Sequence, residues 1–309
     1  MSSVSQPLAV PRQGIASLAR DYATLTKARV TTLIVMTAWA GAYFAGAKSG
    51  VSLLSWTLLN ALVGIGLVSG GTAAINEVVE RDVDALMRRT SRRPLVTGSM
   101  SLLHASVVAF GMTIGGVLYL WFTTNWLTAA LAALTSISYL AVYTPMKRVH
   151  PICTFLGAFP GAMPPVLGWT AIRGRLDGGA LVLFAILFFW QFPHFHSIAW
   201  LYREDYENAG IRMLPVVESD GRSTAFAIVM YALALVPVSL APTLMGMAGR
   251  TYFCGALILS GGMLWFSLRM WTMKLTPIAK ESKVRARNVL QASVIYLPLL
   301  FGLMMINRA

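Results

Sequence analysis

Nine apolar segments dominate this sequence and constrain its fold more than any other feature. Each is roughly 18–24 residues long, which lets a helix cross the ~30 Å hydrocarbon core of a bilayer. They lie near residues 30–47, 52–75, 102–122, 125–143, 152–172, 179–201, 224–247, 252–272 and 288–307. Because no soluble domain is inserted between them, we predict that residues 1–309 form one all-α, polytopic membrane domain with nine transmembrane helices.

The composition excludes the main alternatives to a membrane protein. Hydrophobic residues make up 56% of the chain and charged residues only 12%, about half the share of a soluble domain, which needs a charged surface. The two cysteines, Cys153 and Cys254, have no CxxC spacing, so we interpret them as packing residues. Apolar residues at helical spacing in residues 1–25 predict an interfacial helix within a cytoplasmic N-terminal tail.

The positive charge of the chain has a topological interpretation. There are 25 Lys and Arg residues against 12 Asp and Glu residues, a formal net charge of +13. In a membrane protein, Lys and Arg collect in cytoplasmic loops, so no nucleic-acid partner is needed to explain the excess. If the N-terminus is placed in the cytoplasm, 20 of the 25 basic residues fall on that side. The sequence therefore predicts a cytoplasmic N-terminus and an external C-terminus.

The acidic residues are concentrated in two places, which topology does not explain. Nine of the twelve follow the second or the sixth apolar segment. The first group is Glu77, Glu80, Asp82 and Asp84, and the second is Glu204, Asp205, Glu207, Glu218 and Asp220. Two acidic groups at the cytoplasmic ends of helices indicate a binding site on that side.

The first acidic group has a spacing suited to a divalent cation. Asn76, Glu80 and Asp84 follow each other at intervals of four, so they share one face of a continuous helix. Amide and carboxylate oxygens are ligands of Mg²⁺, which commonly bridges substrate phosphates. The alternative is a polar helix end rich in capping residues. Asp82 falls off the shared face.

Basic residues beside this group suit a diphosphate, although contact with anionic lipids is the alternative. They are Arg88, Arg89, Arg92 and Arg93 after the second segment, and Lys147 and Arg148 after the fourth. In the second acidic group, Asp205 is the best candidate ligand for a second cation, with Glu204 and Asn208 as helpers. Both groups are predicted on the same side of the membrane.

Polar residues inside the sixth apolar segment require a partner or a cavity. The run from Trp190 to His196 contains Gln191, Pro193 and His194. Imidazole can ligate haem iron, so His194 is a candidate haem ligand, with a hydrogen-bonded packing role as the alternative. The fifth segment contains prolines at 160, 164 and 165, which predict a broken helix packed against protein or a cavity.

These residues resemble a known family of membrane enzymes. The run NEVVERDVDALMRRTSRRP at 76–94 resembles the first aspartate-rich motif of the UbiA-type intramembrane prenyltransferases. Four further stretches resemble the protohaem IX farnesyltransferase (haem O synthase) branch of that family. They are LTKARVT (25–31), YTPMKR (143–148), WQFPHFHSIAWLYREDYENAGIRMLP (190–215) and SVIYLPLL (293–300). The chain departs from the pattern at Glu80, where many relatives have Asp, at His196, where an aromatic is expected, and in the second acidic group, which lacks a full DxxxD.

The resemblance implies nine helices around a central cavity that opens to the cytoplasmic side of a bacterial-type inner membrane. It implies transfer of farnesyl from farnesyl diphosphate to a vinyl group of haem b, with addition of water, giving haem O for terminal oxidases. Haem A synthase and oxidase assembly factors are the protein partners it suggests.

The resemblance also implies roles for individual residues. Asn76, Glu80 and Asp84 would hold Mg²⁺ and diphosphate, and Asp205 a second Mg²⁺. Arg93, Lys147 and Arg148 would bind phosphate oxygens, and His194 would place the haem.

Two other functions fit part of the pattern. A UbiA-type transferase acting on a quinone precursor or on chlorophyllide would share the acidic motif, but the histidine-containing block of the sixth segment argues against it. A membrane transporter or haem carrier would also have broken helices and polar groups within its spans. Transporter acids tend toward the membrane midplane, whereas these gather at one face.

Overall fold

The computed structural model describes residues 14–47, 55–272 and 276–308. All the secondary-structure elements in these ranges are helices. Residues 1–13 of the predicted tail, residues 52–54 of the second predicted span, and the basic residues Arg12, Lys48 and Lys274 lie outside the described residues. The interfacial segment predicted in the tail forms a helix, α1 (Ile15–Leu25). The all-α prediction is confirmed.

Seven of the predicted spans correspond to single long helices. These are α2 (Ala28–Ala47), α3 (Trp56–Val79), α6 (Leu102–Thr123), α11 (Gly178–Leu201), α14 (Arg222–Leu244), α15 (Arg250–Trp271) and α16 (Lys280–Ile306). The other two are composite. The fourth span consists of α7 (Trp126–Ile137), the π-helical turn η1 (Ser138–Tyr143) and α8 (Thr144–Met146), and the fifth of α9 (Cys153–Ala162) and α10 (Pro164–Arg173).

Eight helical stretches in the described part of the chain are long and apolar enough to cross a membrane, against the nine predicted. The predicted span not among the eight is α2, which ends where the described residues stop and contains three threonines. The threonine hydroxyl groups donate to backbone carbonyls of their own chain segment, as Thr32 does to Ala28 at 2.9 Å and Thr37 to Leu33 at 2.7 Å. The threonine hydroxyl groups are therefore satisfied internally, as a helix in a bilayer requires.

The fifth span is broken where the prolines predict it. Met163 separates α9 from α10, and Pro164 and Pro165 occupy the first turn of α10. The break is surrounded by protein, since 61% of the most apolar stretch of this span is buried, compared with 22% for α6. The prediction that the broken segment packs against protein is therefore confirmed.

Small residues allow α2 and α10 to pack backbone to backbone. A Cβ added to Gly41 would lie 1.9 Å from the Pro165 carbonyl oxygen, and one added to Gly168 would lie 1.8 Å from that of Ala38. Close approach at small residues is a main source of helix association in lipid, where apolar burial gives no net driving force. This contact connects the first span with the broken one.

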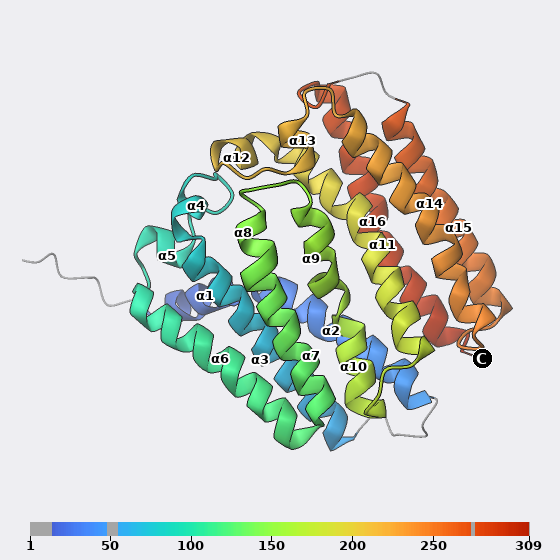
Figure 1. The fold of residues 1–309 in the computed structure, drawn as a ribbon, viewed down its shortest axis with the longest axis horizontal. Coiled ribbons are helices and arrows are strands. Elements are labelled where there is room, and N and C mark those ends of the chain that lie inside the picture. Colours follow the sequence, from blue (N-terminus) through green and yellow to red (C-terminus); the bar gives the residue numbers. More distant parts are fainter. Residues whose placement is uncertain (1–13, 48–54, 273–275, 309) are drawn as a thin grey trace, which may run out of the picture.

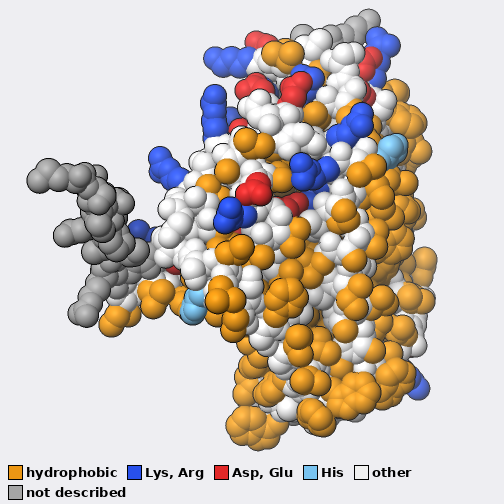
Figure 2. Space-filling view, turned by 60° about the vertical axis from the view of Figure 1, so that its left-hand side comes forward, with side chains coloured by type: hydrophobic (Ala, Val, Ile, Leu, Met, Phe, Trp, Pro, Cys, Tyr) orange, Lys and Arg blue, Asp and Glu red, His pale blue; other side chains and the backbone are white. Residues whose placement is uncertain are grey.

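Four short helices lie together at one end of the bundle (Figure 1). They are α4 (Arg81–Ala85), α5 (Pro94–Thr97), α12 (Arg203–Asn208) and α13 (Leu214–Val217). Figure 2 shows charged side chains gathered toward this end, while hydrophobic side chains cover most of the remaining surface in view. The C-terminus lies at the opposite end of the bundle from α12 and α13 (Figure 1).

Candidate active site at the end of the bundle

The first acidic group lies where α3 gives way to α4. The prediction of a continuous helix is wrong at one residue. Helix α3 ends at Val79, and Glu80 precedes α4 in a non-helical conformation. The helical hydrogen bonds nevertheless continue, from the Glu80 amide to the Asn76 carbonyl at 2.9 Å and from the Asp84 amide to the Glu80 carbonyl at 2.8 Å. Asn76 and Asp84 are both 1% exposed, so the junction carries its polar side chains into the protein.

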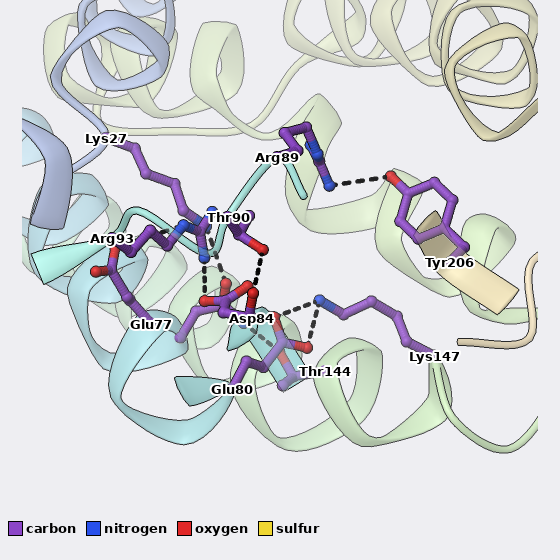
Figure 3. A network of polar contacts seen from close by, with 11 residues as sticks. Lys27, Glu77, Glu80, Asp84, Arg89, Thr90, Arg93, Thr144, Lys147 and Tyr206 are labelled. Atoms are coloured by element: carbon purple, nitrogen blue, oxygen red, sulfur yellow. Dashed lines mark hydrogen bonds and ion pairs between the residues drawn. The ribbon is translucent and has the colours of Figure 1, made fainter. Parts of the chain in front are cut away.

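Glu80 and Asn76 are held by cations from two other elements. The Lys147 ammonium, which follows α8, lies 2.7 Å from Glu80 Oε1 and donates to Oε2 at 2.8 Å. Asn76 Nδ2 also donates to Glu80 Oε2 at 2.8 Å, while Asn76 Oδ1 accepts from Lys27 Nζ at 2.9 Å. Thr144 Oγ1 accepts a further hydrogen bond from Asn76 Nδ2 at 3.3 Å. Glu80 is thus in direct contact with both Asn76 and Lys147, and Figure 3 shows its contact with Lys147.

Arg93 lies between two carboxylates of the same group. Its Nη1 donates to Asp84 Oδ2, and its Nε lies 3.8 Å from Glu77 Oε2. The Thr90 hydroxyl donates to the Asp84 carbonyl at 2.8 Å, which keeps the connecting loop folded back over α4. Figure 3 shows Lys27, Arg93 and Lys147 approaching the three carboxylates from different sides.

Burial changes the acid–base properties of this cluster. It raises the pKa of the Asp84 carboxyl, and the charge of Arg93 works against the rise. It lowers the pKa of the Lys27 ammonium to about 8, and the positive charges of Arg93 and Lys147 add to this lowering. Lys27 has a φ of 47°, in the left-handed region that lysine rarely adopts. This conformation lies at the turn between α1 and α2, where the side chain reaches Asn76.

The second acidic group lies beside the first, but its acids do not join the cluster. Apolar side chains pack the two together, including Val83 and Met87 of the α4 region and Tyr206 of α12. Arg89 Nη2 donates to the Tyr206 hydroxyl at 3.4 Å. Asp205 is half-buried, and no hydrogen bond or ion pair links its side chain to the cluster within the described ranges. Its role as a second metal ligand stays a prediction.

Two further residues of the sequence prediction are clearly outside the cluster. Arg148 is exposed, and within the described part of the chain its side chain makes no polar contact with the cluster, whereas the adjacent Lys147 is buried against Glu80. Asp82 points away, with 93% of its side chain exposed and its carboxylate 3.4 Å from Arg81. The expectation that Asp82 falls off the shared face is confirmed.

His194 lies in α11 and belongs to a separate group of side chains. Its Nδ1 is 2.9 Å from the Ser293 hydroxyl of α16, and its ring stacks on Trp190 with centroids 4.7 Å apart. Ser293 donates its only hydroxyl hydrogen to the Leu290 carbonyl at 2.6 Å, so it accepts from His194. That assignment puts the proton on Nδ1 and leaves the Nε2 lone pair available. The imidazole is therefore oriented in the tautomer that a metal ligand needs.

A second polar residue of α11, Gln191, has a packing role. Gln191 is 2% exposed and donates to the carbonyls of Ala158 and Leu187, both at 3.1 Å. Its side-chain oxygen lies 2.0 Å from the point where a Cβ on Gly161 would stand, so α9 and α11 meet closely there. Nearby, Phe192 stacks on Tyr231 of α14 at 3.6 Å. These contacts fix the helix that carries His194.

The cluster has the donors that Mg²⁺ requires. It offers the Asn76 amide oxygen and the carboxylates of Glu77, Glu80 and Asp84, and both oxygens of the fully buried Glu77 have no hydrogen-bond partner. Within the described ranges, no three His, Cys, Asp or Glu side chains already converge on one point. Lys147 and Arg93 engage Glu80 and Asp84 instead, so a metal ion would have to compete with these cations.

Sequence reasoning missed two members of the cluster. Lys27 has no assigned role in the sequence analysis, although it is part of the LTKARVT stretch (25–31) and lies at the turn between α1 and α2. Glu77 was assigned to the acidic group without a role, because it does not follow the four-residue spacing of Asn76, Glu80 and Asp84. Its interval of seven from Asp84 would place both on one helix face, and this is the signal that could have identified it.

Comparisons with known proteins identify the class of enzyme that this fold and cluster define. The chain belongs to the UbiA prenyltransferase family, whose pattern matches residues 33–304. A protein of Koribacter versatilis named "Protoheme IX farnesyltransferase" is 69% identical over 308 residues, covering 100% of this chain and 99% of its own. A protein of Solibacter usitatus with the same name is 48% identical, covering 94% of this chain and 99% of its own. Family membership makes the chain a prenyltransferase and rules out the transporter alternative.

Solved structures of low sequence identity share the fold. A structure described as digeranylgeranylglyceryl phosphate synthase in membranes superimposes with a TM-score of 0.75 at 15% identity, covering 94% of this chain and 98% of the other. A UbiA homologue from Archaeoglobus fulgidus, bound to GPP and Mg²⁺, gives a TM-score of 0.60 at 17% identity, with coverage of 92% and 99%. The multi-pass membrane fold is therefore common to these proteins.

Proposed function

We propose that this chain transfers the farnesyl group of farnesyl diphosphate to a vinyl group of haem b, with addition of water, giving haem O and diphosphate. The observation that carries the choice of substrates is the full-length similarity, at 69% identity, to a protein named "Protoheme IX farnesyltransferase". The charged cluster supports a diphosphate substrate independently, because it combines oxygen donors for a metal ion with three cations at one end of a membrane-spanning bundle.

The cluster is balanced in charge, which bears on how it would bind ligands. The carboxylates of Glu77, Glu80 and Asp84 are matched by three cations, Lys27, Arg93 and Lys147. A metal ion alone would leave an excess of positive charge in a buried site, and a diphosphate alone an excess of negative charge. Metal ion and farnesyl diphosphate are therefore expected to bind together, each increasing the affinity for the other.

Asn76, Glu80 and Asp84 would hold one Mg²⁺, and Asp205 a second. The metal would stabilise the negative charge that develops on the departing diphosphate. That a UbiA homologue is described bound to GPP and Mg²⁺ supports the choice of this ion.

The basic residues have a clear task in the reaction. Arg93 can bind two phosphate oxygens with its planar fork, while Lys27 and Lys147 act as point charges. Arg148, whose side chain is exposed, would approach the phosphate from the surface of the protein. Their charge is most useful as the bond between farnesyl and diphosphate breaks, because negative charge then moves onto the leaving group. No protein nucleophile is required, since the vinyl group attacks the allylic cation, and water then adds to the resulting haem-side cation and releases a proton.

His194 is proposed to place the haem. Its Nε2 is available because Nδ1 is engaged by Ser293, and stacking on Trp190 fixes the plane of the ring.

Haem A synthase and oxidase assembly factors are proposed partners, and the bacterial inner membrane with a cytoplasmic N-terminus is the proposed location. The opposite placement of the charged end and the C-terminus (Figure 1) supports that orientation.

The test is a reconstituted reaction. Purified protein is incubated with haem b, farnesyl diphosphate and Mg²⁺, and the products are analysed by mass spectrometry for haem O. His194→Ala is expected to weaken haem binding, followed by its absorption spectrum, more than it weakens binding of farnesyl diphosphate. Prenylation of an aromatic quinone precursor in place of haem b would refute the proposed acceptor.

A further inference from the structure

Glu77 is a buried carboxylate whose hydrogen-bonding capacity is unused. It is 0% exposed, and neither of its oxygens has a hydrogen-bond partner in the described part of the chain. The charged groups around it are Arg93, Lys27 and Asp84, and the backbone amide of Leu95 approaches it without completing a hydrogen bond. Removing a carboxylate from water without hydrogen bonds is costly, so its presence at this position calls for an explanation beyond packing.

Arg93 connects Glu77 with Asp84. The two carboxylates are seven residues apart, which places them on the same side of the α3–α4 junction, about two helical turns from each other. Arg93 is shared unequally between them: Nη1 donates to Asp84, whereas Nε remains 3.8 Å from Glu77 Oε2. Figure 3 shows the Arg93 side chain lying between the two acids.

The backbone of Arg93 is fixed, so a change of partner would involve the side chain alone. The Arg93 amide donates to the Thr90 carbonyl at 3.0 Å, and Pro94 begins α5 immediately afterwards. A hydrogen bond from Nε to Glu77 would require a shift of only about 1 Å, since such bonds are ~2.9 Å long. The guanidinium has enough donors to leave Asp84 and still point others toward a phosphate.

We propose that Glu77 is a positioning residue that receives Arg93 when Asp84 binds a divalent cation. The proposal rests on the proposed function in so far as Asp84 is taken to be a metal ligand. A cation at Asp84 repels the guanidinium, and the charge of Glu77 attracts it in the direction that frees the Asp84 oxygens. Glu77 thereby reduces the competition of Arg93 with the metal ion for the Asp84 oxygens, which raises the affinity for the ion. It also keeps Arg93 beside the diphosphate.

A double-mutant cycle distinguishes this role from direct ligation. Mn²⁺ is used as the probe, and its affinity for the full-length protein in lipid nanodiscs is measured from the electron paramagnetic resonance signal of the free ion. Four proteins are compared: wild type, Glu77→Gln, Arg93→Gln and the double variant. Asp82→Asn is the matched control, because it removes an exposed acid from the same segment.

Glu77→Gln is expected to weaken Mn²⁺ binding about 10- to 100-fold, the range of one charge-assisted hydrogen bond. In the Arg93→Gln background the same substitution is expected to change the affinity less than about threefold, because Asp84 no longer has to be released. An equal loss in both backgrounds would overturn the proposal in favour of direct ligation by Glu77, and no loss in either would overturn it as well.

The two proposals fail in different ways. Failure of wild-type protein to bind Mn²⁺ would overturn both the positioning role and the metal site. If the four proteins show the expected Mn²⁺ affinities but the wild-type protein does not farnesylate haem, only the proposed function is overturned. Gln is nearly the same size as Glu and removes a buried charge, so the variant is expected to fold, which a thermal unfolding measurement checks.

Discussion

Replacement of Lys147 by Gln tests whether the charges of the cluster depend on each other. Lys147 lies 2.7 Å from Glu80, and the two side chains are only 10% and 12% exposed. Removing one partner of a buried ion pair costs about 3–5 kcal/mol because the other charge remains buried and unpaired. Since about a tenth of each side chain still reaches the surface, we expect the lower end of that range, about 3 kcal/mol, in the absence of divalent cations.

The free energy of unfolding can be measured for the purified protein in detergent micelles, by titration with sodium dodecyl sulfate in the presence of a chelator. Tryptophan fluorescence serves as the signal. The double variant Glu80→Gln, Lys147→Gln is expected to recover most of the lost stability, because it leaves no unpaired charge. Addition of Mg²⁺ should recover it in the Lys147→Gln single variant by neutralising Glu80.

Two results would contradict this reasoning. A loss of less than about 0.5 kcal/mol in Lys147→Gln would mean that the pair behaves as an exposed salt bridge. Additive losses in the double variant would mean that Lys147 and Glu80 stabilise the protein independently.

Three further predictions follow from the same structure. Asp84→Asn is expected to lower turnover at least about 100-fold, whereas the exposed Asp82→Asn should keep near-normal activity in the same assay. Lys27 loses its proton as the pH rises through about 8, so the affinity for farnesyl diphosphate should fall above that pH in wild type and less in Lys27→Arg, as measured by calorimetry; identical pH profiles would remove Lys27 from the site. Gly168→Leu should prevent the contact of α2 with α10 and abolish monodisperse protein in size-exclusion chromatography, while Gly111→Leu, where a Cβ meets no atom within 4 Å, should not.

Much of the architecture was predictable from the order of residues alone. Apolar segments of membrane-spanning length specify helices, because in lipid every backbone polar group must find its partner within the chain. The break at Met163 follows from the prolines beside it, and the four-residue spacing of Asn76, Glu80 and Asp84 follows from helical periodicity. These are local properties, and each depends on residues within a few turns of one another.

The composition of the site depends instead on contacts between distant segments. Lys27 reaches Asn76 across 49 positions, and Lys147 reaches Glu80 across 67. Arg148 stands beside Lys147 in the sequence but is exposed, whereas Lys147 is buried against Glu80. Ser293 determines the tautomer of His194 from a helix 99 positions away.

The sequence by itself therefore determined the helical membrane fold, the break in the fifth span and the run of residues that carries the carboxylates. Only the tertiary structure decided that Lys27 joins Arg93 and Lys147 at those carboxylates, that Arg148 does not, and that Glu77 is buried without a hydrogen bond. The physical reason is that periodicity and hydropathy act along the chain, whereas charge pairing and burial depend on the packing of helices that are far apart in the sequence.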